Sequence, residues 1–324
     1  MDVFSKYQEI IDKEILGLQL IKAPKQLYEP IEYILKLGGK RIRPAMCIAS
    51  CNYFSGNYSP AIQAALGLEL FHNFTLLHDD IMDNAPIRRN KSTVHEKWNP
   101  NTAILSGDAM MVKASQMILD VPEIVLKDVQ HIFYDTALEV CEGQQYDMDF
   151  ETRLDVSIED YIEMIRLKTA VLLGASLQIG SIIGGASKAD AKLLYDFGQS
   201  IGIAFQLQDD YLDVYGNTDI FGKKVGQDII SNKKTFLLIS CLNLAKGNRL
   251  SELKKWLQKD DFNHLEKVTA IKEIYDYYQV DKISREKMDL YIENSIKLLN
   301  KVNISADYKK ELTDFASKLI NRSN

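Results

Sequence analysis

Residues 71–83 read FHNFTLLHDDIMD, an apolar run at helical spacing that ends in three aspartates. On an α-helix, Asp79 and Asp83 are four residues apart and Asp80 and Asp83 are three apart, so their carboxylates can converge on one edge. Like charges at this spacing destabilise a helix unless a cation binds them. We therefore interpret this stretch as a helix whose end binds a divalent metal ion.

The same pattern returns 130 residues later, where Asp209-Asp210-Tyr211-Leu212-Asp213 follows the apolar run 203–208. Mg²⁺ prefers carboxylate oxygens, keeps several waters and is commonly completed by a substrate phosphate. Two clusters on separate helices therefore predict several Mg²⁺ ions and a phosphorylated substrate. By themselves, the clusters also leave a metal-dependent phosphohydrolase open.

The 324-residue chain is 46% hydrophobic and 26% charged, with a formal net charge of −6. This composition is typical of a globular protein, and its acidic balance gives no reason to expect nucleic acid or an anionic membrane as a partner. The uncharged segment 169–187 is rich in Gly and Ser, so we interpret it as a buried helix and expect no transmembrane segment. The cysteines lack metal-ligand spacing and the first residues lack a signal-peptide pattern, which together favour a cytoplasmic protein.

Apolar residues recur with a 3.6-residue period along most of the chain, and only seven prolines interrupt them. This pattern predicts an all-α protein of about ten to twelve helices. Because no linker or repeat divides the chain, residues 1–324 are expected to form one domain. A capping-box pattern at Ser157–Asp160 marks one helix start. The clearest expected helices span residues 3–19, 25–37, 60–83, 101–119, 121–149, 157–183 and 187–213.

Seven basic residues accompany the six aspartates of the two clusters. Two follow a diglycine, two follow the first cluster, one lies inside an apolar helix, and two follow the second cluster. They are Lys40, Arg43, Arg88, Arg89, Lys168, Lys223 and Lys233. Such a set suits two anionic groups, one held through metal and one held directly by Lys and Arg.

In their order along the chain, these motifs resemble those of the trans-isoprenyl diphosphate synthases of the polyprenyl synthetase family. The resemblance runs from Gly38 to about Lys234. It rests on GGKRIRP (38–44), DDIMD with the arginine pair (79–89), GQQYD (143–147), Lys168-Thr169 and FQLQDDYLD (205–213). It implies the isoprenoid synthase fold, a single-domain helical bundle around a central substrate cavity, and it also implies a homodimer.

The resemblance also implies a role for each matching residue. The Mg²⁺ bound to an allylic diphosphate would be ligated by Asp79, Asp83 and Asp209. Asp80, Asp210 and Asp213 would support these ligands, and of these three Asp210 and Asp213 are also expected to bind metal. The same diphosphate would be held by Arg88, Lys168, Lys223 and Lys233. Isopentenyl diphosphate would be held by Lys40, Arg43, His72 and Arg89. Thr169 and Gln206 would line the reaction centre, with Gln144 and Asp147 nearby.

This chain departs from the family pattern in two places. After the arginine pair, where the family commonly has Gly and Pro, it has Asn90-Lys91-Ser92. Because Asn tolerates the left-handed backbone conformation, the turn there can be kept. An extra Lys224 leaves open which of Lys223 and Lys224 contacts phosphate.

The implied reaction is the Mg²⁺-dependent head-to-tail condensation of isopentenyl diphosphate with an allylic diphosphate. Its product length should depend on the side chains below the first cluster. With a helical rise of 1.5 Å per residue, Phe74 and Phe71 lie roughly 7 Å and roughly 12 Å below Asp79. With Thr75 they share one side of the helix. In the family, a bulky residue five positions before the first motif accompanies short products. We therefore predict geranylgeranyl or farnesyl diphosphate as the product.

Three alternatives are a longer-chain polyprenyl diphosphate synthase, a non-catalytic partner subunit and a metal-dependent phosphohydrolase. A partner subunit usually has damaged aspartate motifs, whereas both motifs are intact here. A hydrolase needs further histidine ligands. Apart from His78, which precedes the first cluster, no two histidines are three or four residues apart as helical ligands would be. They are His72, His95, His131 and His264.

Overall fold

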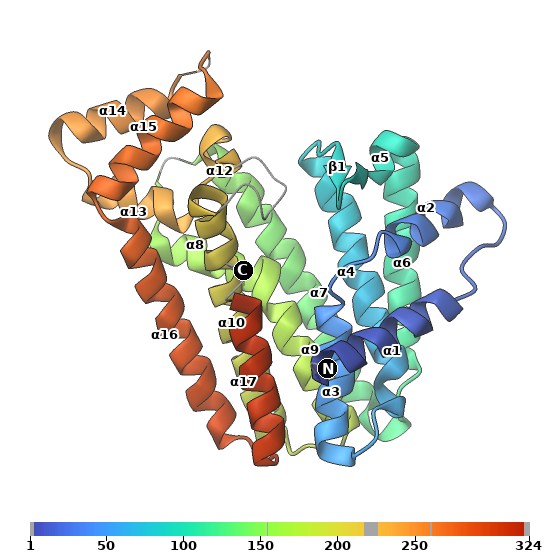
Figure 1. Ribbon diagram of the computed structural model, residues 1–324. Coiled ribbons are helices and arrows are strands. Elements are labelled where there is room, and N and C mark those ends of the chain that lie inside the picture. Colours follow the sequence, from blue (N-terminus) through green and yellow to red (C-terminus); the bar gives the residue numbers. More distant parts are fainter. Residues whose placement is uncertain (1–2, 154, 217–225, 260, 321–324) are drawn as a thin grey trace. The chain divides into compact units, whose positions relative to one another are not determined.

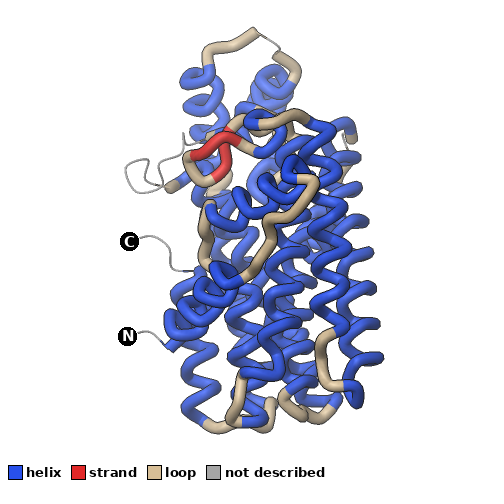
Figure 2. The backbone as a smooth tube through the Cα atoms, turned by 90° about the vertical axis from the view of Figure 1, so that its right-hand side faces the viewer, coloured by secondary structure: helices blue, strands red, loops and turns tan. Residues whose placement is uncertain are grey.

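The computed structural model describes residues 3–153, 155–216, 226–259 and 261–320. Within these ranges the regular structure is helical apart from one two-stranded hairpin, drawn in red in Figure 2. The prediction of an all-α protein is therefore confirmed. No helix of this part of the chain combines the length and the apolar character needed to cross a membrane.

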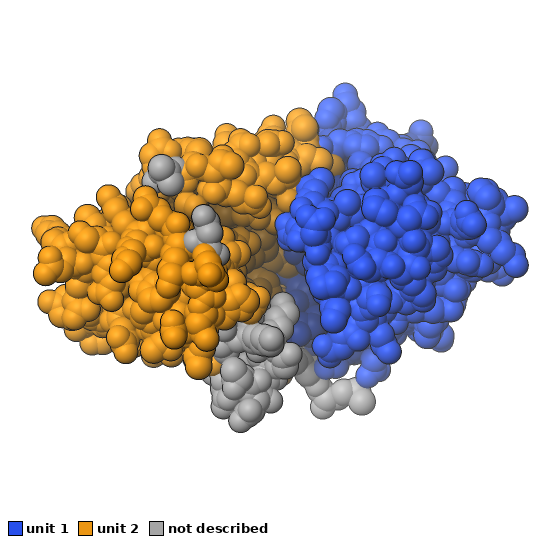
Figure 3. Space-filling model, turned by 90° about the horizontal axis from the view of Figure 1, so that it is seen from above, with its two compact units in different colours: residues 1–135, 175–195, 303–311 blue, residues 136–174, 196–302, 312–324 orange. Residues whose placement is uncertain are grey.

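The chain divides into two compact units, which have different colours in Figure 3. Unit 1 comprises residues 1–135, 175–195 and 303–311, and unit 2 comprises residues 136–174, 196–302 and 312–324. Four helices include residues of both units. They are α7 (Glu123–Thr152), α9 (Val171–Ile183), α10 (Lys188–Tyr215) and α17 (Ala306–Ile320). The prediction of one domain over residues 1–324 stays a prediction.

Unit 1 is built around α4 (Ile62–Met82), the helix that carries the first aspartate cluster. It packs against α3 (Ile42–Ser55) and α6 (Pro100–Leu119), as Figure 1 shows. Helix α1 packs on α3 and α4, and α2 packs on α4 and α6. The smaller elements and the two N-terminal helices are α1 (Val3–Gly17), α2 (Lys25–Lys36), η1 (Ser59–Ala61), β1 (Ile87–Arg88), β2 (Lys91–Ser92) and α5 (Val94–Lys97).

Two glycines let α4 and α6 approach closely. A Cβ atom on Gly67 would lie 3.0 Å from the carbonyl oxygen of Ala114. A Cβ atom on Gly107 would lie 2.3 Å from the ring of His78, whose Nε2 is 3.2 Å from the carbonyl oxygen of Ile104. Helix α4 is thereby held against α6 near both of its ends, by close contacts that larger residues at the two glycine positions would prevent.

Unit 2 contains two apolar clusters. One surrounds Tyr161 and Phe236, and the other surrounds Leu253 and Tyr275. The second cluster joins a helical hairpin, α14 and α15, to the rest of the unit. The helices that lie wholly in unit 2 are α8 (Ile158–Ile165), α12 (Gln227–Ile230), α13 (Phe236–Leu244), α14 (Gly247–Leu257), α15 (His264–Tyr277) and α16 (Val280–Lys301).

The helix expected at residues 157–183 widens in its middle. It begins with the predicted capping box between Ser157 and Asp160, but residues 166–170 form a π-helix, η2 (Arg166–Ala170). Two glycines accommodate this widening. A Cβ atom on Gly143 of α7 would lie 2.3 Å from the backbone nitrogen of Lys168, and one on Gly202 of α10 would lie 2.6 Å from the Cα of Ala170. π-Helical turns are rare and occur frequently at functional sites.

The other expected helix limits agree with the structure to within three residues. Short elements such as α5 and α12 add to the ten to twelve helices expected, because one helical turn carries too few apolar positions to show a period. The hairpin of β1 and β2 was not predicted for the same reason, since each strand has only two residues.

Candidate active site

The first aspartate cluster lies at the C-terminal end of α4. Asp79 and Asp80 belong to its last turn, and Asp83 is its C-cap residue. The C-terminal end of a helix carries partial negative charge, so three carboxylates there are unfavourable without a cation. Asp80 is 2% exposed, whereas Asp83 is open to solvent. The cluster thus has one buried carboxylate and one that a metal ion can reach freely.

Arg88 supplies positive charge to this cluster. Its Nε donates to Oδ1 of Asp80 at 2.7 Å, and its Nη2 donates to Oδ2 of Asp79 at 3.3 Å. Burial raises the pKa of the Asp80 carboxyl, and the Arg88 guanidinium opposes that rise. Arg88 therefore lies beside the carboxylates to which the resemblance assigns the allylic diphosphate.

A tight hairpin presents Arg88 and Arg89. Ile87 pairs with Ser92 and Arg88 pairs with Lys91, which leaves Arg89 and Asn90 as a two-residue turn. Their φ angles are 52° and 61°, as a type I′ turn requires at both central positions. The expectation that Asn90 supports a left-handed turn is confirmed, whereas the left-handed conformation of Arg89 was not foreseen.

The side chain of Arg89 lies against the diglycine that precedes Lys40. Its Nη1 donates to the carbonyl oxygen of Gly38. A Cβ atom on Gly39 would lie 2.8 Å from Nη2 of Arg89, and Gly39 has a φ of 147°. Only glycine suits that position, because a side chain would both strain the backbone and displace the guanidinium. The diglycine and the arginine pair, 50 residues apart, are thereby brought together.

Arg43 and His72, to both of which the resemblance assigns isopentenyl diphosphate, are in direct contact. Nη1 of Arg43 lies 3.2 Å from Nε2 of His72. Because a guanidinium can only donate, Nε2 accepts and the imidazole is neutral. Burial and the nearby Arg43 charge lower the pKa of His72 well below its ordinary value. Nε of Arg43 is buried and has no hydrogen-bond partner within the described ranges, which leaves a donor that an anion could satisfy.

Arg41, in the same motif, faces the interior of unit 1. Its Nη1 lies 2.6 Å from Oε1 of Glu69, and its Nε lies 2.9 Å from Oδ1 of Asp12. Its Nη2 donates to the carbonyl oxygen of Leu35 at 2.6 Å. Arg41 thus ties α1, α2 and α4 to the start of α3, where the two cations of the motif emerge. Sequence reasoning missed this role because an arginine among other basic residues carries no sign of burial.

Aromatic rings pack along α4 below the first cluster. Phe71 is 1% exposed, and its ring centroid lies 5.7 Å from that of Phe74 and 5.5 Å from that of Phe133 on α7. The Phe74 ring lies 4.7 Å from the ring of His78. The Thr75 hydroxyl donates to the carbonyl oxygen of residue 72 at 2.8 Å. Phe133 was missed because the sequence does not tell which residue of another helix meets Phe71.

The second aspartate cluster lies near the C-terminal end of α10, in unit 2. Asp210 is 5% exposed and accepts two hydrogen bonds, from the hydroxyl of Tyr161 at 2.6 Å and from Nε2 of Gln206 at 2.9 Å. The hydroxyl of Thr169 donates to Oε1 of Gln206 at 3.2 Å. This chain of bonds links the π-helical segment to α10 and sets the orientation of the Gln206 amide.

Asp228, which sequence reasoning missed, joins this cluster. Its backbone N–H donates to Oδ2 of Asp213 at 2.9 Å. Burial, together with the carboxylates of Asp210 and Asp213, raises the pKa of Asp228, and burial also raises the pKa of Asp210. Asp228 follows Asp213 by 15 residues without helical register, so no spacing rule could find it.

Two of the predicted cations share one carboxylate in unit 2. Nζ of Lys168 lies 2.6 Å from Oδ2 of Asp147, and Nζ of Lys233 lies 3.8 Å from the same oxygen. Burial would raise the pKa of Asp147, but the ammonium groups of Lys233 and Lys168 outweigh it and hold that pKa below its ordinary value. The predicted phosphate-binding Lys223, like Lys224, lies outside the described residues.

The donor chemistry of both clusters fits Mg²⁺. Each cluster lies near a helix C-terminus and contains one aspartate whose pKa burial raises, Asp80 in the first and Asp210 in the second. A divalent cation stabilises negative charge at such positions. Among the described residues, no three Asp, Glu, His or Cys side chains are grouped closely enough to enclose a metal ion. Open sets of carboxylates suit Mg²⁺, which keeps waters and takes oxygen from substrate phosphate.

The predicted residues are divided between the two units. Unit 1 holds Lys40, Arg43, Phe71, His72, Phe74, Thr75, Asp79, Asp80, Asp83, Arg88 and Arg89. Unit 2 holds Lys168, Thr169, Gln206, Asp209, Asp210, Asp213 and Lys233. That both groups act on one substrate pair stays a prediction.

Comparison with known proteins identifies relatives over most of the chain. The polyprenyl synthetase family matches residues 24–277. A short chain isoprenyl diphosphate synthase of Methanothermobacter thermautotrophicus is 39% identical over 246 residues, or 76% of each chain. A geranylgeranyl diphosphate synthase of Methanosarcina mazei is 41% identical over 243 residues, or 74% of each chain. The crystal structure of a geranylgeranyl pyrophosphate synthase matches with a TM-score of 0.95 at 41% identity, covering 100% of both chains.

Proposed function

The chain belongs to the polyprenyl synthetase family, and we propose that it makes geranylgeranyl diphosphate from isopentenyl diphosphate and an allylic diphosphate. It is a prenyltransferase that synthesises a short-chain trans-prenyl diphosphate. The chain length of the product is a proposal, and farnesyl diphosphate is the alternative product.

The main support for a short product is the packing of Phe71 beneath the first aspartate cluster. The growing chain extends away from its diphosphate, so rings that lie below Asp79 on α4 limit how far it can grow. Phe71 is packed between Phe74 and Phe133, with ring centroids within 5.7 Å on both sides. A side chain so supported cannot rotate away without loss of packing, which favours a short product.

The aspartates of each unit are proposed to bind Mg²⁺ together with diphosphate oxygen. In unit 1 the ligands would be Asp79 and Asp83, and in unit 2 they would be Asp209, Asp210 and Asp213. When bound, Mg²⁺ would supply positive charge to the leaving diphosphate. The hydrogen bonds that Asp210 accepts from Tyr161 and Gln206 keep its carboxylate in one orientation.

The basic side chains are proposed to bind the two diphosphates directly. Arg88, Lys168 and Lys233 would stabilise the charge that develops on the allylic diphosphate as its C–O bond breaks. Lys40, Arg43 and Arg89 would hold isopentenyl diphosphate, with neutral His72 orienting Arg43. The isopentenyl double bond then attacks the allylic cation, which forms the new C–C bond and leaves a carbocation on the isopentenyl unit. That cation loses a proton from an adjacent carbon to the released diphosphate, and a new double bond forms. No side chain has to act as a nucleophile.

A product assay tests this function. The purified protein is incubated with Mg²⁺, excess isopentenyl diphosphate and dimethylallyl, geranyl or farnesyl diphosphate in turn, and products are separated by chain length. We expect mainly geranylgeranyl diphosphate, and no product when a chelator removes Mg²⁺. Products mainly longer than geranylgeranyl would overturn the proposed length. Phosphate release without prenyl transfer would point to a hydrolase, and an inactive isolated chain would point to a partner subunit.

We also propose that the chain forms a homodimer through α6. Leu105, Val112 and Leu119 are exposed apolar side chains spaced seven residues apart, so they form one stripe on that helix. Ile104 is exposed beside Leu105. Exposed apolar side chains gathered on one face of a helix can form an interaction surface. Light scattering of the wild type and of Val112→Glu tests the proposal, because a monomeric wild type would contradict it.

We propose a cytoplasmic location as well. All four cysteines lie in the described part of the chain and are free thiols, three of them buried. Free thiols suit a reducing compartment. Fractionation of the producing cells checks this, since recovery of the protein from a secreted or membrane fraction would contradict it.

A further inference from the structure

Lys267 of α15 is a lysine with 0% exposure. Its Nζ donates to the carbonyl oxygen of Ile230 at 3.2 Å and to Oδ1 of Asn232 at 2.7 Å. It also lies 4.1 Å from the centroid of the Phe262 ring. None of these three partners is a carboxylate. Burial of an ammonium group without a carboxylate partner is costly in free energy. General stability therefore does not explain why a lysine occupies this position.

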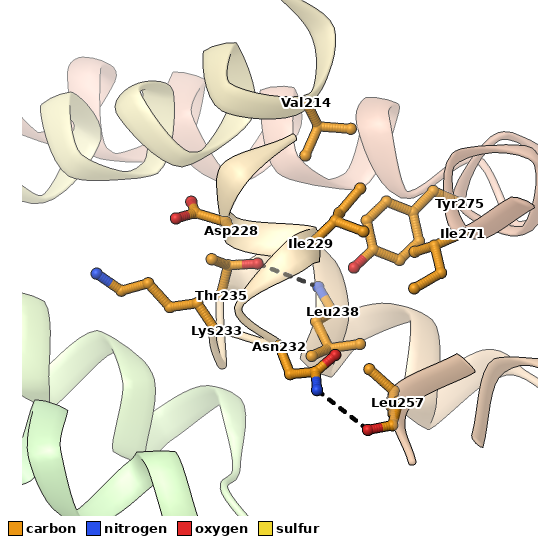
Figure 4. Close-up of a pocket in the computed structure, with 10 residues that line it drawn as sticks. All are labelled: Val214, Asp228, Ile229, Asn232, Lys233, Thr235, Leu238, Leu257, Ile271 and Tyr275. Carbon is orange, nitrogen blue, oxygen red and sulfur yellow. Dashed lines mark hydrogen bonds between the residues drawn. The ribbon is translucent and has the colours of Figure 1, made fainter. Parts of the chain in front are cut away.

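Asn232 connects Lys267 to the rest of unit 2. Its φ of 56° is left-handed, which turns the chain sharply after α12. Its Nδ2 donates to the carbonyl oxygen of Leu257 at the end of α14 at 3.0 Å, a bond drawn in Figure 4. The side-chain amide of Asn232 thus makes two hydrogen bonds. Its oxygen accepts from Lys267, and its nitrogen donates to α14. Its side chain has one orientation in which both bonds form.

The residue after this turn is Lys233, one of the proposed diphosphate-binding cations. Its backbone N–H donates to the carbonyl oxygen of Asp228 at 2.9 Å. In Figure 4 the side chains of Asn232 and Lys233 leave the turn in different directions, and both line a small pocket with room for roughly one water molecule. A turn held at Asn232 therefore fixes where the Lys233 side chain begins.

The ammonium of Lys267 also caps α12. The carbonyl oxygen of Ile230 is the last of that helix, and it accepts a hydrogen bond from the Lys267 ammonium. One buried cation thus holds two successive points of the chain, the end of α12 and the side chain of Asn232. Methionine, which has a side chain of similar length, could fill the space but has no N–H group to donate to either oxygen.

We propose that Lys267 is a positioning residue for the allylic diphosphate site. By holding the end of α12 and Asn232, it keeps Lys233 aimed at the diphosphate. The proposal rests on the proposed function, in which Lys233 binds the allylic and not the isopentenyl diphosphate. It therefore predicts an effect on one substrate and not on the other, which loss of general stability would not produce.

Steady-state kinetics of Lys267→Met test this inference, because Met keeps the length of the side chain and removes the charge and the donors. We expect the KM for the allylic diphosphate to rise about tenfold, as for the loss of charge-assisted hydrogen bonds, with the KM for isopentenyl diphosphate changed less than about twofold. Lys255→Met, an exposed lysine of α14, should leave both KM values unchanged. Equal changes in both KM values, or none, would overturn the proposal.

A second variant covers the case in which Lys267→Met fails to fold. Asn232→Gly suits the left-handed backbone and removes the amide that links Lys267 to α14. For Asn232→Gly alone we expect the same rise in the allylic KM, and an unchanged allylic KM in this variant would overturn the proposal. Where both single variants fold, the double variant should be no worse than either of them, since both break one connection. Fully additive effects would contradict the shared connection.

Lys233→Met distinguishes failure of the proposed function from failure of the positioning role of Lys267. If the wild type makes no prenyl product, the proposed function fails before any variant is compared. If the wild type is active and Lys233→Met leaves the allylic KM unchanged, the positioning role of Lys267 is overturned and the prenyltransferase activity stands.

Discussion

Arg41 and Glu69 form an ion pair 2.6 Å long in which each side chain is 3% exposed. Glu69 lies on α4 two residues before Phe71, and Arg41 is the N-cap residue of α3 with a left-handed φ of 45°. Nδ2 of Asn73 donates to the same Glu69 oxygen at 2.9 Å. The pair therefore joins the motif that carries Lys40 and Arg43 to the helix that carries the aspartates.

Replacement of Glu69 by Met should destabilise the protein strongly. It leaves the buried Arg41 guanidinium without its buried carboxylate partner and with only the half-exposed Asp12 carboxylate in contact, which typically costs about 3–5 kcal/mol. Denaturant unfolding measures the loss. The matched control is Glu32→Gln, which breaks the Lys36–Glu32 pair with side chains 56% and 36% exposed and should cost less than about 1 kcal/mol. Equal losses in the two variants would contradict a buried, essential pair.

Phe74→Ala should lengthen the product, because it opens space below Asp79, and Phe71→Ala should act in the same direction. Chain-length analysis of the products measures both. Phe4→Ala is the control: Phe4 is 2% exposed on α1, so its loss should cost about 3 kcal/mol of stability without a change in product. An unchanged product from both α4 variants would show that these rings do not limit growth.

Gly143→Ala should lower kcat/KM by about 100-fold, since small displacements of catalytic groups have effects of that size. The added Cβ would lie 2.3 Å from the backbone nitrogen of Lys168, so the π-helical segment with Lys168 and Thr169 has to move. Gly17→Ala, where nothing lies within 4 Å of the added Cβ, should retain wild-type activity. Wild-type kinetics for Gly143→Ala would show that the segment tolerates the shift.

His72 should make stability fall below about pH 6.5. Burial and Arg43 hold the pKa of folded His72 well below its ordinary value, so below pH 6.5 the unfolded chain binds the proton that the folded chain excludes. The free energy of unfolding then decreases as pH falls below about 6.5. His72→Asn should remove that part of the pH dependence, and the exposed His264→Asn should not. The same slope in His72→Asn as in the wild type would exclude His72 as its source.

Local patterns predicted much of the fold. The apolar period of α4 and α10 placed both helices to within two residues at each end, with the aspartates near their C-termini. The left-handed tolerance of Asn90 also agreed with the turn in the structure. The π-helical segment could not be predicted in this way, because the glycines that accommodate it, Gly143 and Gly202, belong to two other helices.

The same limit applies to the candidate site. The residue types of the cations and carboxylates were readable, but not their partners. Lys168 and Lys233 both face Asp147, Arg41 turns inward to Glu69, and Asp228 joins Asp213, each across a distance in sequence that no spacing rule covers.

By itself, the sequence determined the all-α class, the two helices that end in aspartates and the kind of chemistry those ends can support. Helical periodicity and like-charge repulsion act within a few residues, so a single chain displays them directly. Only the tertiary structure decided which charge is paired, which ring supports Phe71, and that a buried Lys267 holds the turn before Lys233. Those outcomes depend on burial and on contacts between residues far apart in the chain, which come into being only when the helices pack.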